Sequence, residues 1–314
     1  KRNLIYIVLE SEEMTNVSKA NGGGLDVSLI PNLENLALKN TSFSNTDKLG
    51  GALNLVGTGY TAASLVGQTS GTPLSLKMDG NSYHGYSQSY PGLYTLGEVL
   101  EKNGYRNYFM LGSDADFGGR SDYFEQHGNY KIMDYNYAKS KNWIENDYNV
   151  WWGYEDKKLF EFAKNELKQI SKNNEPFNFT ILTADTHFID GYYDPSCPTG
   201  KFETQYENVF NCNDQMIYDF ITWIQKQDFY KNTTIVISGD HLTMQGNFYD
   251  SKISKNYERT VYNAIMNSAI NNTNNKLNRN FSVLDLYPTT LAALGATIEG
   301  NVLGFGTNLY SGVP

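Results

Sequence analysis

The sequence predicts an α/β fold in which helices cover both faces of a mostly parallel sheet. Short apolar runs rich in β-branched and aromatic residues recur along the chain, and amphipathic helical patterns alternate with them. A chain of 314 residues is also long enough to bury a sizeable core. Because no internal repeat and no low-complexity linker interrupts the pattern, we predict a single domain over residues 1–314.

The predicted strands are short segments that are apolar on both faces, which is typical of a sheet covered on both sides. They comprise residues 3–9, 106–111, 177–183 and 233–238.

The predicted helices keep their apolar residues to one broad face or end in a helix-stop signal such as Asn-Gly. They comprise residues 95–102, 156–171, 213–227 and 282–294. The stretch 45–90 is rich in Gly and Ser with weak periodicity, so we expect it to contribute loops rather than a second core.

The composition of the chain argues against some partners and limits where a membrane anchor can lie. A formal charge of −9 without a Lys/Arg cluster argues against nucleic acid as a partner. No apolar run is long enough to span a bilayer, and the opening KRNLIYIVLE lacks the regions of a signal peptide. We therefore expect any targeting or anchoring segment to lie elsewhere in a longer protein.

The two cysteines, Cys197 and Cys212, flank the polar segment CPTGKFETQYENVFNC, which has the character of a surface excursion. A disulfide between them would close a loop of about fifteen residues and contribute roughly 3 kcal/mol in an oxidising compartment. The alternative is two free thiols in a cytosolic protein.

Polar side chains follow three predicted strands at the point where each strand ends. Glu10 follows the first strand, Asp185 and His187 follow the third, and Asp240 and His241 follow the fourth. The carboxyl ends of parallel strands share one edge of a sheet, so these groups can converge there. Carboxylates and imidazoles are metal ligands, although Glu10 as a salt-bridge partner and His187 as a structural histidine remain the alternatives.

The stretch GTGYTAASLV places Thr61 at or near the start of a helix, after a turn that contains Gly57 and Gly59. An ordinary N-cap is one interpretation. The other is a nucleophile, because a helix N-terminus favours negative charge and a bound metal ion can ionise a hydroxyl that is otherwise unreactive.

These motifs also resemble a known family. The segments NLIYIVLES, GTGYT and VISGDH are similar to those of the lipoteichoic acid synthase and phosphoglycerol transferase branch of the alkaline phosphatase and sulfatase superfamily. The resemblance continues through LGSDADFGGR, TADTHFIDGYY and LDLYPTTLAALGATIEGNVLGFGTNLYSG, and so covers essentially the whole chain.

The resemblance implies an enzyme at the extracellular face of a bacterial membrane, anchored by upstream transmembrane helices. It implies that Thr61 attacks the phosphate of phosphatidylglycerol, that diacylglycerol leaves, and that glycerol phosphate passes to an acceptor hydroxyl. It also implies one divalent metal ion, most commonly Mn²⁺, held by residues that match the family's ligands: Glu10, Thr61, Asp240 and His241.

The resemblance further implies that Arg120 and His187 hold the glycerol phosphate; by approximate position, Asp114 is a candidate for its hydroxyls. His187 is also suited to protonate the leaving group. Gly118 departs from the tryptophan found in the polymerising synthases. This departure and the cysteine pair favour the subgroup that modifies cell-envelope glycans, although no segment identifies the acceptor.

The alternative functions are those of a sulfatase, an alkaline phosphatase, a phosphoethanolamine transferase and a non-catalytic descendant. The TAAS at residues 61–64 lacks the pattern from which a sulfatase forms formylglycine, and four histidines are few for a two-metal alkaline phosphatase. A phosphoethanolamine transferase shares the threonine nucleophile but typically has more disulfides and uses zinc. A non-catalytic glycan-binding descendant would be expected to lack a metal ligand, and none is missing here.

Overall fold

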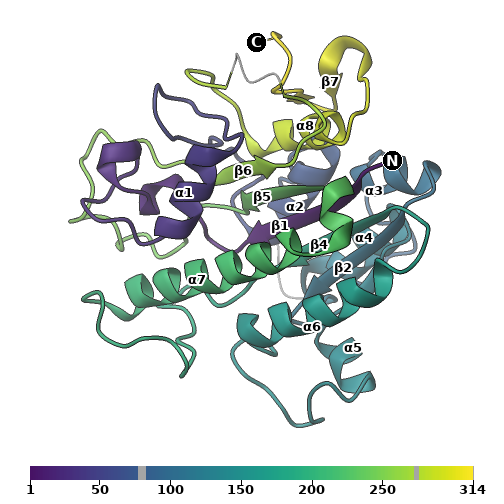
Figure 1. Ribbon diagram of the computed structural model, residues 1–314, viewed down its shortest axis with the longest axis horizontal. Coiled ribbons are helices and arrows are strands. Elements are labelled where there is room, and N and C mark those ends of the chain that lie inside the picture. Colours follow the sequence, from purple (N-terminus) through teal and green to yellow (C-terminus); the bar gives the residue numbers. More distant parts are fainter. Residues whose placement is uncertain (77–82, 272–275, 314) are drawn as a thin grey trace.

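The computed structural model describes residues 1–76, 83–271 and 276–313. Within them, six strands form one central sheet in the order β3-β2-β4-β1-β5-β6 (Figure 1). The first five run parallel to one another, and β6 is antiparallel to β5. The strands are β1 (Asn3–Leu9), β2 (Arg106–Leu111), β3 (Lys131–Met133), β4 (Phe177–Leu182), β5 (Thr233–Gly239) and β6 (Asn263–Met266).

Strand β1 lies inside the sheet, between β4 and β5. Its side chains alternate between two cores, as the period of a strand requires. Ile5 and Ile7 pack in one core, whereas Leu4 and Tyr6 pack in the other. An apolar run on both faces is therefore what this position needs.

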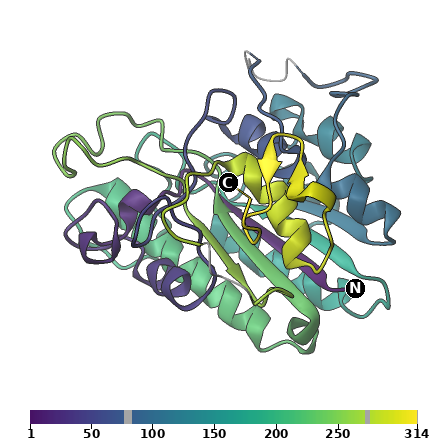
Figure 2. The same cartoon turned by 90° about the horizontal axis from the view of Figure 1, so that it is seen from above.

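Helices cover both faces of the sheet, which confirms the predicted fold class. One face carries α1 (Pro31–Lys39), α5 (Tyr135–Ser140), α6 (Asp156–Ile170) and α7 (Gln205–Gln225). The other carries α2 (Thr61–Ser70), α3 (Leu96–Lys102), α4 (Arg120–Gln126) and α8 (Leu286–Ala293). Seen from above, the C-terminal segment with α8 and the hairpin of β7 (Val302–Leu303) and β8 (Gly306–Thr307) lies over this second face (Figure 2).

The prediction for residues 213–227 placed the start of that helix too late. Helix α7 begins at Gln205, where Thr204 and Glu207 form a reciprocal capping box. The second half of the segment between the cysteines is therefore helical and not a surface excursion, since Tyr206, Val209 and Phe210 are buried in it.

The prediction for residues 282–294 covered two elements. A 3-10 turn (Val283–Asp285) leads directly into α8. Among the described residues, no helix combines the length and the apolar character needed to cross a bilayer.

Candidate active site

Four polar residues meet at the carboxyl edge of the sheet. Glu10 directly follows β1, Asp240 and His241 directly follow β5, and Thr61 is the first residue of α2. Strands β1 and β5 pair in register up to Leu9 and Gly239, so the residues after them emerge side by side. The backbone N–H of Asp240 continues this pairing and donates to Leu9 O at 2.9 Å.

The side chains of these four residues contact one another. Thr61 Oγ1 lies 3.2 Å from Glu10 Oε2 and 3.4 Å from His241 Nε2. His241 Nε2 lies 3.5 Å from Glu10 Oε1 and 3.3 Å from Asp240 Oδ2. One ligand atom from each of Glu10, Asp240 and His241 falls within 4.8 Å of the other two, so this group could hold a metal ion.

The hydrogen bonds around the cluster leave two side-chain atoms available as metal ligands. Asp240 Oδ1 accepts from the backbone N–H of Ser11 at 2.8 Å and of His241 at 2.7 Å, whereas Oδ2 is buried and has no hydrogen-bond partner among the residues that the structure describes. His241 Nδ1 donates to Leu242 O at 2.8 Å, which turns the lone pair of Nε2 toward the carboxylates. A buried carboxylate oxygen is costly without a partner, so these residues fit a divalent cation.

The electrostatics of the cluster also favour a cation. Burial, with the charge of Glu10, raises the pKa of Asp240 to about 7. Burial opposes the charged form of His241, but Asp240 and Glu10 outweigh it and raise the pKa of the imidazole. Buried negative charge is therefore concentrated at this point, where a metal ion would neutralise it.

Helix α2 is attached to the end of β5 by the face that carries Thr61. Ser64 donates to Asp240 O, and Gln68 Nε2 donates to Gly239 O at 3.0 Å. Residues 61, 64 and 68 recur at helical spacing, so these contacts and the Thr61 hydroxyl share one face. The side chains of α2 itself therefore fix the position of Thr61.

Thr61 is not the N-cap of α2. Tyr60 occupies that position without a side-chain capping bond, and the Thr61 hydroxyl instead faces Glu10. Of the two glycines before it, only Gly57 has a positive φ, at 85°, and a Cβ there would approach Pro73 to 3.0 Å. Gly59 is not required by its conformation, and a Cβ there would meet nothing closer than 3.7 Å.

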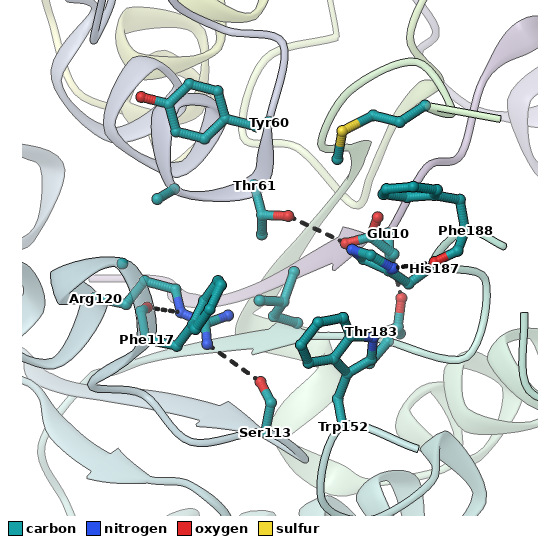
Figure 3. Close-up of a pocket in the computed structure, with 15 residues that line it drawn as sticks. Glu10, Tyr60, Thr61, Ser113, Phe117, Arg120, Trp152, Thr183, His187 and Phe188 are labelled. Carbon is teal, nitrogen blue, oxygen red and sulfur yellow. Dashed lines mark hydrogen bonds between the residues drawn. The ribbon is translucent and has the colours of Figure 1, made fainter. Parts of the chain in front are cut away.

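A pocket of about 320 Å³ opens in front of Thr61 (Figure 3). Arg120 and His187, which the sequence nominated, both line it together with Glu10. Most of the remaining lining side chains are apolar, among them Phe117, Trp152, Phe188 and Met244.

Arg120, at the start of α4, is held in place by the turn before it. Its Nε donates to Phe117 O at 2.9 Å, and its Nη2 donates to Asp114 O at 2.7 Å and to Ser113 Oγ at 3.3 Å. Nη1 has no partner among the described residues. Burial lowers the pKa of Arg120 to about 10, so the guanidinium remains charged at neutral pH and can bind an anion in the pocket.

His187 follows β4, and its ring packs between two aromatic side chains. The ring centroid is 4.8 Å from those of both Trp152 and Phe188. Nδ1 contacts Phe188 O at 2.6 Å, and because a carbonyl only accepts, Nδ1 carries the proton. Burial lowers the pKa of His187, so at neutral pH the ring is mostly uncharged and Nε2 can accept a proton.

Asp114 does not line this pocket. Its Oδ1 accepts from the backbone N–H of Asp116 at 2.9 Å, and its backbone carbonyl holds Arg120. A role for Asp114 at the glycerol hydroxyls therefore stays a prediction, whereas its support of Arg120 is a feature of the structure.

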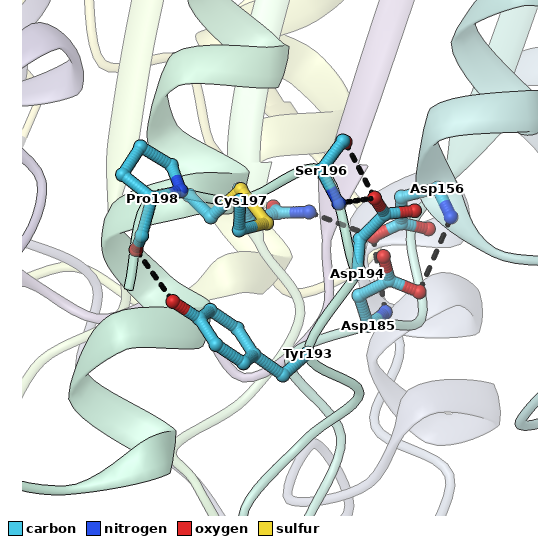
Figure 4. The surroundings of a disulfide bond; sticks show 9 residues. Asp156, Asp185, Tyr193, Asp194, Ser196, Cys197 and Pro198 are labelled. Atoms are coloured by element: carbon cyan, nitrogen blue, oxygen red, sulfur yellow. Dashed lines mark hydrogen bonds between the residues drawn. A yellow bond between two sulfur atoms is a disulfide. The ribbon is translucent and has the colours of Figure 1, made fainter. Parts of the chain in front are cut away.

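Asp185 is not part of the group that could hold a metal ion; it lies beside Asp156 in the surroundings of the disulfide (Figure 4). Its Oδ1 accepts from the backbone N–H of Asp156 at 3.2 Å, and Asp156 accepts from the backbone N–H groups of Ala184 and Asp185 at 2.8 and 3.0 Å. Burial raises the pKa of Asp156 to about 6 and, together with the charge of Asp156, raises that of Asp185. This pair joins the start of α6 to the loop that carries His187.

Cys197 and Cys212 form a disulfide with a Cα–Cα distance of 5.7 Å (Figure 4). The bond joins α7, which contains Cys212, to the loop after β4.

The sequence did not nominate the aromatic side of the pocket. Phe117 begins a three-residue 3-10 helix and Trp152 lies in a turn, and segments this short give no periodic signal in the sequence. For Phe117, its position three residues before Arg120 was the one available clue.

Comparison with known proteins identifies relatives of this fold and sequence. A family model described as Sulfatase matches residues 2–296. Phosphoglycerol transferase I from Escherichia coli is 29% identical over 317 residues, which is 99% of this chain and 39% of that protein. This chain therefore spans about two fifths of that relative's length.

Two solved structures share the fold at lower identity. The lipoteichoic acid synthase LtaP from Listeria monocytogenes superposes with a TM-score of 0.70 at 19% identity, over 98% of this chain and 75% of that one. The phosphoglycerol transferase GacH from Streptococcus pyogenes, in complex with sn-glycerol-1-phosphate, gives 0.55 at 16% identity, over 93% and 74%. The relatives and the family model confirm the resemblance found in the sequence, and the fold is that of this superfamily.

Proposed function

Because this chain belongs to the sulfatase family, we propose that it is the catalytic domain of a metal-dependent phosphoglycerol transferase. The observation that carries the proposal is the contact of the Thr61 hydroxyl with Glu10 and His241, in a pocket that also contains Arg120 and His187. This set offers a nucleophile, a cation site, an anion site and a proton carrier within one cavity. The similarity to phosphoglycerol transferase I supports glycerol phosphate as the transferred group.

In the first half-reaction, Thr61 Oγ1 forms a bond to the phosphorus of phosphatidylglycerol, and the bond from phosphorus to the diacylglycerol oxygen breaks. Glu10 Oε2, which lies 3.2 Å from Thr61 Oγ1, takes the proton of the Thr61 hydroxyl. Arg120 binds the phosphate oxygens, and His187 supplies a proton to the departing oxygen. Burial favours neutral His187, but the bound anion favours its protonated form.

In the second half-reaction, the hydroxyl of a cell-envelope glycan or of a glycerophosphate chain attacks the same phosphorus. His187 takes the proton of this hydroxyl, the bond from phosphorus to Thr61 breaks, and Glu10 returns the proton to the Thr61 oxygen. The two half-reactions restore every group, so no further reactant is needed.

We propose Mn²⁺ as the metal ion, held by Glu10, Asp240, His241 and the Thr61 hydroxyl. Oxygen ligands with a single imidazole suit this ion, although zinc and magnesium can use similar sets. When bound, such an ion lowers the pKa of a hydroxyl and neutralises charge on a phosphate. Asp240 Oδ2 supports the presence of a cation, because it is buried and no described residue donates a hydrogen bond to it.

We place residues 1–314 at the extracellular face of a bacterial membrane as one domain of a longer, membrane-anchored enzyme. The disulfide supports an oxidising compartment, because such bonds rarely persist in the cytosol. This chain covers 39% of the length of phosphoglycerol transferase I from Escherichia coli, which supports its being part of a longer protein.

The test is the release of diacylglycerol from phosphatidylglycerol and from phosphatidylethanolamine, with Mn²⁺ present. We expect release from phosphatidylglycerol by the wild-type chain and a loss of at least about 10³-fold in Thr61→Ala, because the nucleophile is absent. Release from phosphatidylethanolamine alone would favour a phosphoethanolamine transferase. If neither lipid is cleaved, the non-catalytic glycan-binding interpretation gains support and the proposal fails.

A further inference from the structure

We propose that a rim of exposed apolar side chains around the pocket docks onto the surface of a lipid bilayer. This apolar rim consists of Phe117, Trp151, Trp152, Ile189 and Met244. This proposal rests on the proposed function in one respect, because docking matters for catalysis only if the donor is a lipid.

The members of the apolar rim are large and unusually accessible for apolar residues. Ile189 is 67% exposed, Phe117 and Trp152 are 43% exposed, Met244 is 42% exposed and Trp151 is 37% exposed. A single exposed apolar residue needs no explanation, but a group of five around one opening marks an interaction site.

The residues of the rim come from four different loops that meet at the pocket. Phe117, Trp152 and Met244 line the pocket itself, and Trp151 and Ile189 adjoin lining residues in sequence. The ring centroids of Phe117 and Trp152 are 6.0 Å apart, and those of Trp151 and Trp152 are 6.5 Å apart. Figure 3 shows Phe117 and Trp152 beside each other in the pocket that contains Thr61.

The polar edge of Trp151 is already used within the protein. Its indole Nε1 donates to Ala184 O at 3.0 Å, so the part of the ring that remains exposed is apolar. Tryptophan is a typical residue of membrane interfaces, and aliphatic side chains bind there in proportion to the apolar area they bury.

The geometry of the substrate favours a bilayer over a sugar chain as the occupant. The phosphodiester of a lipid lies beside the boundary of the acyl region, and Thr61 lies inside a pocket whose mouth the rim surrounds. If the apolar rim binds at the membrane interface, the lipid phosphodiester reaches Thr61 while the acyl chains stay in the bilayer. A sugar stacks on aromatic faces, but the most exposed member of the rim, Ile189, is aliphatic.

Charge does not provide the attraction. The chain carries a formal charge of −9, and phosphatidylglycerol is itself anionic. Binding through the rim is therefore expected to persist or strengthen at high salt, whereas electrostatic docking would weaken.

The test uses Ile189→Ser, which alters the rim without substituting a residue that lines the pocket. The matched control is Phe305→Ser, because Phe305 is 75% exposed in the β7–β8 hairpin, whose backbone bonds Gly71 at the far end of α2 from Thr61. Co-sedimentation with vesicles of phosphatidylcholine and phosphatidylglycerol measures binding at two salt concentrations. Diacylglycerol release is measured from the same vesicles and from a short-chain phosphatidylglycerol that is dissolved as monomers.

We expect Ile189→Ser to bind vesicles about three- to tenfold more weakly and to cleave vesicle lipid correspondingly more slowly. Its rate on the dissolved donor should equal that of the wild type, and Phe305→Ser should match the wild type in every assay. Vesicle binding by Ile189→Ser at the wild-type level, or weaker binding at high salt, would overturn the inference.

Two further outcomes distinguish this inference from a failure of the proposed function and from a sugar-binding role of the rim. If the wild type cleaves neither donor, the proposed function fails, while vesicle binding still decides the role of the rim. If Trp152→Ala weakens the use of a soluble glycan acceptor and Ile189→Ser leaves vesicle binding unchanged, the rim is a sugar-binding surface and the inference is wrong.

Discussion

Asp240 uses its two carboxylate oxygens for different purposes. Oδ1 fixes the backbone after β1 and β5 through Ser11 and His241. Oδ2 lies 3.3 Å from His241 Nε2 and accepts no hydrogen bond from any described residue. A buried side chain with one satisfied and one free oxygen is expected where a cation completes the site. The residue therefore links the end of the sheet to the chemistry.

We expect Asp240→Asn to bind Mn²⁺ at least about 100-fold more weakly, because the amide keeps the Oδ1 contacts but removes a charged ligand. Since the substitution also removes a buried carboxylate, the free energy of unfolding of the metal-free protein should not fall by more than about 1 kcal/mol. Calorimetric titration with Mn²⁺ and urea unfolding measure the two quantities. Asp114→Asn serves as the control, and equal Mn²⁺ affinity in both variants would refute the assignment.

At the scale of elements, strands could be predicted better than helix ends. Residues 3–9 and 106–111 form strands with the predicted bounds, because an interior parallel strand needs an uninterrupted apolar run. The start of α7 was missed because Asn208 and Cys212 obscure the apolar face of Tyr206 and Phe210. The capping box of Thr204 and Glu207 is readable in the sequence and would have corrected the prediction.

The functional site was only partly predictable from the sequence, because topology places only those residues that directly follow a strand. Glu10, Asp240 and His241 follow strands directly, so topology alone predicts that they converge. Trp152 and Ile189 lie in loops whose course depends on tertiary contacts, and no pattern in the sequence places them at the pocket.

The contact between α6 and the loop after β4 gives a pH-dependent prediction. Burial raises the pKa of Asp156 from 3.8 to about 6, so the folded protein binds this proton more tightly than the unfolded chain. The stabilisation that comes from protonated Asp156 is present at low pH and is lost as pH rises from about 4 through about 6. Asp156→Asn removes this dependence.

We therefore expect the wild type to exceed Asp156→Asn in free energy of unfolding by more at pH 4 than at pH 7. Urea unfolding at several pH values measures the difference. Because the charge of Asp156 raises the pKa of Asp185, the difference includes the change at Asp185, whereas carboxyls away from this pair largely cancel. A difference that stays constant over this range, or that grows toward pH 7, would show that the carboxyl at position 156 is not protonated in the folded protein.

At the scale of the whole molecule, the fold assembles one site from distant parts of the sequence. Thr61 lies 51 residues from Glu10 and 180 residues from His241, yet its hydroxyl contacts both side chains. The parallel order of β1 and β5 and the attachment of α2 to their ends produce these contacts. Three members of the apolar rim, Phe117, Trp152 and Met244, line the pocket in front of Thr61, so the proposed membrane contact lies at the opening of the site.

The central claim is that Thr61 carries the glycerol phosphate covalently during transfer. The most direct test is intact mass spectrometry of the wild type, Thr61→Ser and Thr61→Ala after incubation with Mn²⁺ and phosphatidylglycerol, without an acceptor. We predict an added mass of one glycerophosphoryl group on the wild type and a smaller fraction on Thr61→Ser, located at residue 61, with none on Thr61→Ala. An adduct on Thr61→Ala, or diacylglycerol release by that variant at the wild-type rate, would contradict the account.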